Sequence, residues 1–345
     1  MSKIFYLLLI IIFFFSTGCS FDNKSGIWKD RAKELKVKKL DENVKFVFSK
    51  VEKFRKEIST DSPISLQPPV NNFEWLEENF DSSNFVPHLE YENKKNLIYK
   101  SKKILKKTNS SFSDFEPLIL NKNIFFYDNQ GTIFNFSLDS KTIVWDFNFY
   151  KKKFKKFPIK INFQINSDNL IAADNLGYFY SIDINSGKIR WAKNYGVPFR
   201  SNIKVSKKYT FSVNQDNKFY GINNIDGEKR LDLETFPSFL QSQQKTSVSI
   251  DKDNQNVFFI TSAGEIYSIN YSTNIINWMY KTTSRSVDKT VDLFFSSPLI
   301  HYRDQIVVST SVSTISLNSL TGLINWEIPI STYIRPAISN NFIFL

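Results

Sequence analysis

Few residues of this chain have the types and spacing that catalysis requires. Its two histidines, His88 and His301, show no spacing that suggests a metal site or a nucleophilic triad, and we expect His301 to lie at the surface after a strand. The polar stretch 251–255 resembles the start of a calcium-binding loop, but Asn256 stands where that loop needs glycine and Ser262 where it needs glutamate. We therefore interpret this stretch as a turn between strands. Neither a nucleophile elbow nor a phosphate-binding loop occurs.

The elements that must position any functional side chain follow from a fifteen-residue phrase that occurs five times. Its clearest copy runs from Gly177 to Trp191 and reads GYFYSIDINSGKIRW. The five copies end at positions 145, 191, 231, 278 and 326, so the phrase recurs every 40 to 48 residues. A period of this size fits one four-stranded propeller blade. The sequence therefore predicts an all-β fold, namely a β-propeller of four-stranded blades.

Local features of the phrase indicate a hairpin that ends in tryptophan. Aromatic and β-branched residues alternate with small ones, as in the stretch 179–182, which favours a half-buried strand. The eleventh position is glycine in three copies, Asn274 in the fourth and Lys141 in the exception, and Gly and Asn tolerate the positive φ of a tight turn. The tryptophan is expected to pack between neighbouring sheets rather than to bind a ligand. These structural residues are Trp145, Trp191, Trp278 and Trp326.

The number of blades follows from the same spacing. Tyr99 holds the tryptophan position 46 residues before Trp145, so we expect residues 96–100 to form a strand that closes the last blade. Five full intervals separate Tyr99 from Trp326, and a further blade begins near Arg335. This predicts five to six blades. Because an open propeller would leave two unpaired sheet edges, we expect a C-terminally incomplete form of an eight-bladed propeller.

The N-terminus indicates export. Residues 4–15 form an apolar run of the length of a signal-peptide core, and the small residues after it lead to Cys19. This pattern is similar to a bacterial lipoprotein signal, in which the cysteine is acylated; Ser16 departs from it, since leucine is usual there. An ordinary secretory signal remains the alternative. We expect a signal peptide over 1–18, a tether with a possible short helix over 19–72, and the propeller over 73–345. Serine after Cys19 resembles outer-membrane sorting, with the lipid as anchor.

Composition restricts the class of partner. Hydrophobic residues make up 41% and aromatic residues 16% of the chain, which is enough for a large β core. The formal net charge is +11, but lysine runs fall at expected loops and strand edges, where they discourage edge-to-edge pairing. An exported protein also meets little nucleic acid. We therefore expect no nucleic-acid partner, while an acidic protein surface stays open as one.

The repeats and the lipoprotein-like N-terminus together resemble the BamB family, whose members carry pyrroloquinoline-quinone-type propeller repeats. The resemblance covers residues 73–345. It implies a non-enzymatic scaffold without a cofactor, on the periplasmic face of the outer membrane, that docks to BamA and aids insertion of unfolded outer-membrane proteins. In the family a loop of the pattern apolar-x-apolar-Arg-small contacts BamA, and Val197, Phe199 and Arg200 match it here. The acidic pair expected before the next blade is not evident around 241–247.

Two other functions remain open at this point. Quinone-dependent dehydrogenases share the repeat, but they need a cofactor cage, a carboxylate-rich Ca²⁺ site and an acidic base. Many also carry adjacent cysteines, whereas Cys19 is the single cysteine of this chain. A propeller that binds a small ligand or a peptide in its central channel is the other alternative. Grooves between blades could also accept unfolded β clients by strand addition.

Overall fold

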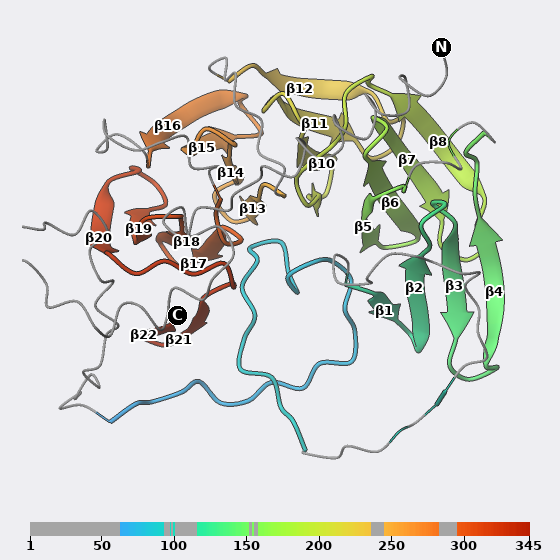
Figure 1. Ribbon diagram of the computed structural model, residues 1–345, viewed down its shortest axis with the longest axis horizontal. Coiled ribbons are helices and arrows are strands. Elements are labelled where there is room, and N and C mark those ends of the chain that lie inside the picture. Colours follow the sequence, from blue (N-terminus) through green and yellow to red (C-terminus); the bar gives the residue numbers. More distant parts are fainter. Residues whose placement is uncertain are drawn as a thin grey trace, which may run out of the picture. The chain divides into compact units, whose positions relative to one another are not determined.

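Five four-stranded antiparallel sheets make up most of the computed structural model (Figure 1). The structure describes residues 63–92, 97, 99–100, 116–151, 154, 158–235, 245–282 and 295–345. The expected signal peptide (1–18), Cys19 and the tether as far as residue 62 lie outside these residues, as do positions 96 and 98 of the expected first strand. Pro63–Leu345 form one unit, and only this unit is described below.

Each sheet is one blade, because its four strands follow one another both in the chain and in the sheet. The strands are β1 (Leu118–Leu120), β2 (Asn123–Tyr127), β3 (Ile133–Ser137) and β4 (Thr142–Phe147); β5 (Ile161–Asn166), β6 (Asn169–Asp174), β7 (Tyr178–Asp183) and β8 (Ile189–Asn194); β9 (Lys204–Val205), β10 (Tyr209–Val213), β11 (Phe219–Asn223) and β12 (Lys229–Leu233); β13 (Val248–Asp251), β14 (Asn256–Ile260), β15 (Glu265–Asn270) and β16 (Ile275–Lys281); β17 (Ile300–Tyr302), β18 (Gln305–Ser309), β19 (Thr314–Asn318) and β20 (Ile324–Ile328). A sixth sheet contains β21 (Ala337–Ser339) and β22 (Phe342–Phe344). The predicted all-β propeller of four-stranded blades is confirmed.

The order of strands within a blade sets their exposure. The first strands, β1, β5, β9, β13 and β17, lie toward the centre, and the fourth strands lie at the outside (Figure 1). Apart from β2, in which only Phe125 is buried, the second and third strands are covered on both faces, so β14 is buried throughout and β7 is buried over its four central residues. The outer strands β8 and β20 alternate between exposed and half-buried residues. This gradient explains why the third strand is the most apolar part of the phrase.

The hydrophobic core lies between neighbouring blades rather than inside any one of them. One cluster joins residues of the second blade, such as Ile171 and Phe179, to Val205 and Ile222 of the third. Similar clusters join the first blade to the second, the third to the fourth, and the fourth to the fifth. Each blade therefore buries both faces of its sheet only when its neighbours are present.

The hairpin turn and the tryptophan of the phrase meet across these junctions. Gly187 has φ +68°, and its would-be Cβ lies 2.7 Å from the ring of Trp145 in the preceding blade. The Trp145 Nε1–H donates to the carbonyl of Ile184 at 2.8 Å. Lys141 and Asn274 occupy the same turn position, with φ +59° and +57° respectively. The expected positive-φ turn is therefore present in each of these hairpins.

Tyr99 takes a related place on the first blade. Its ring stacks on Phe136 at 5.8 Å between centroids, and the Lys141 amine lies 5.6 Å from the ring centroid. Since Lys141 is the counterpart of Gly187, Tyr99 lies on the first blade as Trp145 lies on the second. Neither residue 97 nor residues 99–100 form a strand.

The beginning and the end of the described unit also contact each other. The backbone N–H of Gln67 donates to Ser339 Oγ in β21 at 2.9 Å.

Candidate functional site

The loop that matches the family's partner-binding pattern lies between β8 and β9. Phe199 is only 2% exposed and packs edge-to-face on Phe179 and Tyr220, with centroids 5.1 and 6.0 Å apart. Its side chain therefore fixes the loop against the core and is not available to a partner. Of the three residues that match the family pattern, Phe199 is thus the one whose side chain the core covers. Val197 is half-buried.

The backbone of Arg200 is held by the third blade and by the residues that lead into the fourth. Its backbone N–H donates to Val213 O at 3.0 Å, and its carbonyl accepts from Thr246 N at 3.2 Å. The half-buried guanidinium donates through Nη2 to Gln215 Oε1 at 3.1 Å. Because the backbone on both sides is fixed, the guanidinium is presented from a rigid position.

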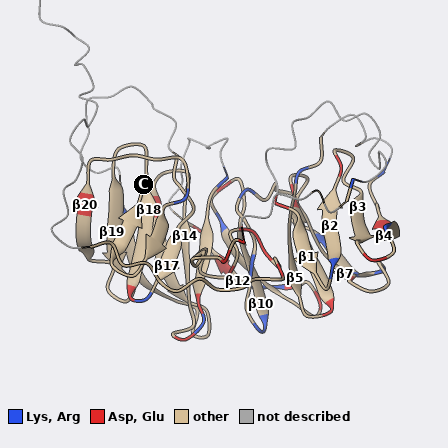
Figure 2. Cartoon of the chain, turned by 90° about the horizontal axis from the view of Figure 1, so that it is seen from below, with Lys and Arg blue, Asp and Glu red and all other residues tan. Residues whose placement is uncertain are grey.

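A cavity of about 440 Å³ opens beside Arg200, where the inner strands of the blades begin. Its basic side chains are Lys160, Arg200 and Lys245, and Glu78 is the one carboxylate in its lining. Lys245 forms an ion pair with that Glu78. The remaining lining residues are apolar, amide-bearing or hydroxyl-bearing: Tyr127, Ile161, Phe199, Pro298, Asn79, Asn162, Asn175, Asn202, Thr246, Ser247 and Ser296. Elsewhere the acidic and basic residues lie close together along the blade ends (Figure 2).

The centre of the blades is occupied by residues 74–85, which we call the central segment (Figure 1). Trp75 exchanges two backbone hydrogen bonds of 2.8 Å with Ile119 in β1. The carbonyl of Leu76 accepts from Ile165 N in β5 at 2.8 Å. The segment thus extends from one inner strand to the next. The sequence did not predict this position, because the region contains no copy of the repeat phrase.

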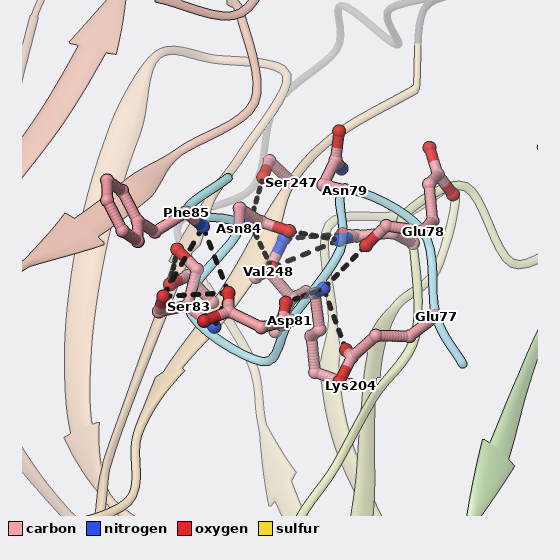
Figure 3. Close-up of polar contacts among 12 residues, drawn as sticks. Glu77, Glu78, Asn79, Asp81, Ser83, Asn84, Phe85, Lys204, Ser247 and Val248 are labelled. Atoms are coloured by element: carbon pink, nitrogen blue, oxygen red, sulfur yellow. Dashed lines mark hydrogen bonds and ion pairs between the residues drawn. The ribbon is translucent and has the colours of Figure 1, made fainter. Parts of the chain in front are cut away.

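The central segment surrounds the side chain of Lys204 in β9 (Figure 3). The Lys204 side chain is fully buried, and its three N–H groups find three acceptors: Glu77 Oε2 at 2.9 Å, Glu78 O at 2.8 Å and Asp81 O at 2.6 Å. A buried ammonium is tolerated only with such complete satisfaction. Burial raises the pKa of the Glu77 carboxyl, and the Lys204 ammonium opposes this shift without cancelling it.

Asn84 fixes the far end of the segment. It has no exposed surface and φ +59°, and its Nδ2 donates to Val248 O at 2.8 Å and to Leu299 O at 2.7 Å. Its Oδ1 accepts from Asn202 Nδ2 at 3.2 Å (Figure 3). One side chain therefore joins the third, fourth and fifth blades.

The histidines and the acidic stretch do not form a catalytic site. His301 lies in β17 rather than after it, its side chain is 12% exposed, and its Nε2 is 3.7 Å from Asp251 Oδ2. The expectation of a surface histidine is wrong, because the inner strand is covered by the central segment: His301 N donates to Ser83 O at 2.9 Å. Burial lowers the pKa of His301. His88 is exposed, and its Nδ1 lies 2.8 Å from Gln67 O.

The stretch after Asp251 is a turn, as expected. Asp251 Oδ1 accepts from the backbone N–H groups of Asp253 and Asn254 at 3.1 and 3.2 Å. Both bonds are local, and they hold the turn between β13 and β14. Within the described residues, no three His, Cys, Asp or Glu side chains lie together in a way that could hold a metal ion.

A buried carboxylate in the second blade was missed by the sequence analysis. Asp174 Oδ1 accepts from Leu176 N and Tyr178 N at 2.8 Å each, and its Oδ2 accepts from the Tyr150 hydroxyl at 2.5 Å. Burial raises the pKa of Asp174 and of Tyr150. The sequence signal was present: Asp128 and Asn214 stand at the same place before the phrase and bind the same two turn N–H groups.

The chain matches the family model of the outer membrane protein assembly factor BamB over residues 129–345, which is more than half of its length. It belongs to the BamB family. No curated protein sequence matches it. No helix among the residues that the structure describes is long and apolar enough to cross a membrane.

Solved structures with the same fold include BamB itself and two dehydrogenases. BamB from Moraxella catarrhalis has a TM-score of 0.54 at 12% identity, over 64% of this chain and 66% of that one. A europium-containing methanol dehydrogenase has a TM-score of 0.54 at 12% identity, over 74% and 58%. The quinohemoprotein alcohol dehydrogenase from Comamonas testosteroni has 0.51 at 10%, over 63% and 42%. This chain thus spans less than two thirds of each, and the likeness concerns the fold alone.

Proposed function

We propose that this BamB-family chain is a non-enzymatic scaffold lipoprotein of the machinery that assembles β-barrel proteins in the outer membrane. The family match over residues 129–345 is the observation that carries the proposal. Acyl chains on Cys19 would hold the propeller at the periplasmic face of the outer membrane, because each buried CH₂ contributes about 0.8 kcal/mol. BamA is the proposed docking partner.

The docking residues that we propose are Val197 and Arg200, with Phe199 acting from the core to hold their loop. The guanidinium of Arg200 lies at a cavity with two further basic side chains, Lys160 and Lys245. A surface of this charge suits an acidic partner and would steer its approach. Loss of one rigid arginine at the centre of an interface costs about 2 kcal/mol or more of binding free energy.

The exposed edges of the outer strands are a second part of the proposal. Within the described residues, β4, β8, β12, β16 and β20 each pair with one neighbour only. Ile275 and Ile276 at the start of β16 are 59% and 44% exposed. An unfolded outer-membrane protein could add a strand to such an edge and place apolar side chains beside these residues.

A crosslinking experiment tests the docking proposal. The full-length lipoprotein is crosslinked in its own membranes, captured, and its partners are identified by mass spectrometry. We expect BamA to be enriched, and Arg200→Glu to reduce that enrichment tenfold or more. The matched control is Lys188→Glu, which makes the same charge change on an exposed residue at the outer rim. Undiminished BamA recovery with Arg200→Glu, at unchanged thermal unfolding, would remove Arg200 from the interface.

Because dehydrogenases have a similar fold, a redox function of this chain must also be tested. In this chain the central segment runs between the inner strands, where its backbone bonds to the first, second, fourth and fifth blades and it accepts hydrogen bonds from Lys204 of the third. We therefore expect that the purified full-length protein neither binds pyrroloquinoline quinone nor reduces an artificial electron acceptor. Saturable quinone binding with acceptor reduction would replace the scaffold proposal by a redox function.

A further inference from the structure

The central segment touches the inner strands in the order of the blades. Trp75 bonds to β1 and Leu76 to β5, and the next residues surround Lys204 of β9. The carbonyl of Ser82 then accepts from Ile250 N in β13 at 2.7 Å, and that of Ser83 accepts from His301 N in β17 at 2.9 Å. Backbone hydrogen bonds of this kind, combined with a few side-chain pockets, are how proteins bind extended peptides.

Charge and side-chain pockets give this contact its selectivity. Residues 74–85 carry four carboxylates, Glu74, Glu77, Glu78 and Asp81, and no lysine or arginine. Basic residues around the segment contact it: Lys204 forms an ion pair with Glu77, and Lys245 forms one with Glu78. Arg335 donates a hydrogen bond to Asn79 Oδ1 at 3.1 Å. The amide of Asn84 enters a second buried site between Val248 and Leu299.

The segment is nevertheless separate from the blades. It contributes no strand to any sheet, and its own turn is held internally, since Asp81 Oδ1 accepts from Ser83 N and Phe85 N at 2.9 and 3.0 Å. No strand pair of the five blades includes a residue of the segment, because each of those pairs joins strands of one blade.

We propose that the inner strands form a binding site for an extended acidic peptide, and that residues 74–85 occupy this site as a tethered ligand. Lys204 is the specificity residue, because its buried ammonium requires a carboxylate and two carbonyls. The site adjoins the docking face at Lys245 and Glu78, but its specificity residue Lys204 is not part of that face, and neither Val197 nor Arg200 bonds to the segment. A tether of this kind holds its ligand at an effective concentration of about millimolar, so a free peptide at micromolar concentration binds only after the segment is weakened.

Peptide binding in trans tests the proposal. The probe is a fluorescent synthetic peptide with the sequence of residues 74–85, and anisotropy reports its binding to the full-length protein. Glu77→Ala weakens the tethered segment but leaves Lys204 in place. We expect the probe to bind Glu77→Ala at least tenfold more tightly than wild type. Lys204→Met in the Glu77→Ala background removes the site, and the gain should then disappear.

Two controls separate a tethered ligand from a plain piece of core. A probe carrying Glu77→Gln should lose most of its affinity for the Glu77→Ala protein. Hydrogen exchange should show the amides of residues 75–84 opening together in Glu77→Ala, while those of β14 and β18 stay protected. If Glu77→Ala does not fold, Asn84→Ala serves in the same scheme, because it removes the two bonds at the other end.

Three results would overturn the inference. One is a folded, segment-loosened variant that does not bind the probe. Another is a gain in probe binding that survives Lys204→Met, since that binding would bypass the proposed site. The third is exchange of the segment only together with β14 and β18, because the segment would then be part of one cooperative core. None of these results depends on whether BamA binds.

Discussion

Gly187→Ala should destabilise the propeller more than Gly196→Ala, and the difference measures the contact between neighbouring blades. Both glycines have positive φ, at +68° and +78°, so an added Cβ strains both backbones by about 1–2 kcal/mol. At Gly196 nothing lies within 4 Å of the added atom. At Gly187 three atoms of the Trp145 ring lie within 3.0 Å, which no Cβ accepts without movement.

The extra cost at Gly187 follows from that overlap. Forcing one carbon into a packed site costs about 1–3 kcal/mol, so the total for Gly187→Ala is about 2–5 kcal/mol. Displacing the ring also threatens the 2.8 Å bond from Trp145 Nε1 to Ile184 O. We expect Gly196→Ala to cost only the strain, about 1–2 kcal/mol.

Urea unfolding followed by far-ultraviolet circular dichroism is the assay, because it does not rely on tryptophan emission. The decisive comparison uses Trp145→Ala, which should itself cost about 3–5 kcal/mol. In that background the ring is gone, and Gly187→Ala should cost no more than Gly196→Ala. Equal costs of the two glycine substitutions in the wild-type chain would refute the argument, as would an undiminished cost of Gly187→Ala beside Trp145→Ala.

Three further predictions concern the blade junctions and their charges. Tyr150→Phe should cost about 1.5–3 kcal/mol at pH 7, because it removes a hydrogen bond to a buried carboxylate. It should also raise the pKa of Asp174 further, because the hydroxyl that stabilises the carboxylate is gone. The folded chain then holds a proton that the unfolded chain has lost, so the free energy of unfolding should fall more steeply as pH rises above about 4. Urea unfolding between pH 4 and 8 checks both the cost at pH 7 and this pH dependence. Asp183→Asn should blunt acid denaturation: the hydrogen bond from Arg190 lowers the pKa of Asp183, so its stabilisation is present above about pH 4 and is lost as pH falls. An acid-unfolding curve that is identical for the variant and wild type would contradict this. Trp191→Phe should cost about 0.5–1.5 kcal/mol beyond its lost area, because its Nε1–H donates to Asn224 O at 3.0 Å; Tyr209→Phe, whose hydroxyl makes no bond to a neighbouring blade in the described structure, is the control for the urea measurement.

The blade pattern could be predicted because its causes are local. A strand needs alternating side chains, a hairpin needs a residue of positive φ, and both recur in the phrase from Gly177 to Trp191. Pro117, Pro158 and Pro298 stand just before the first strands of their blades, where a missing N–H does little harm. Repetition then multiplies a weak local signal into a secure prediction.

The site was predicted less well, because its burial depends on distant residues. Phe199 and Arg200 are neighbours in the loop, yet the core of two blades takes the first and leaves the second half-exposed. The sequence around His301 indicates only a residue near a strand end. It is covered because Ser83, which is distant in the sequence, accepts a hydrogen bond from its backbone N–H.

What the sequence by itself determined is therefore the repeating unit: its four strands, its turn and the tryptophan that follows. These depend on contacts within about 45 residues, for which periodicity and turn chemistry are sufficient. Only the tertiary structure decided what fills the centre. Lys204 and Glu77 are 127 residues apart, and a lone lysine in a short strand gives no sign of a buried partner. Because a buried charge is stable only when all its acceptors arrive together, its environment is a property of the assembled blades and not of any local stretch of chain.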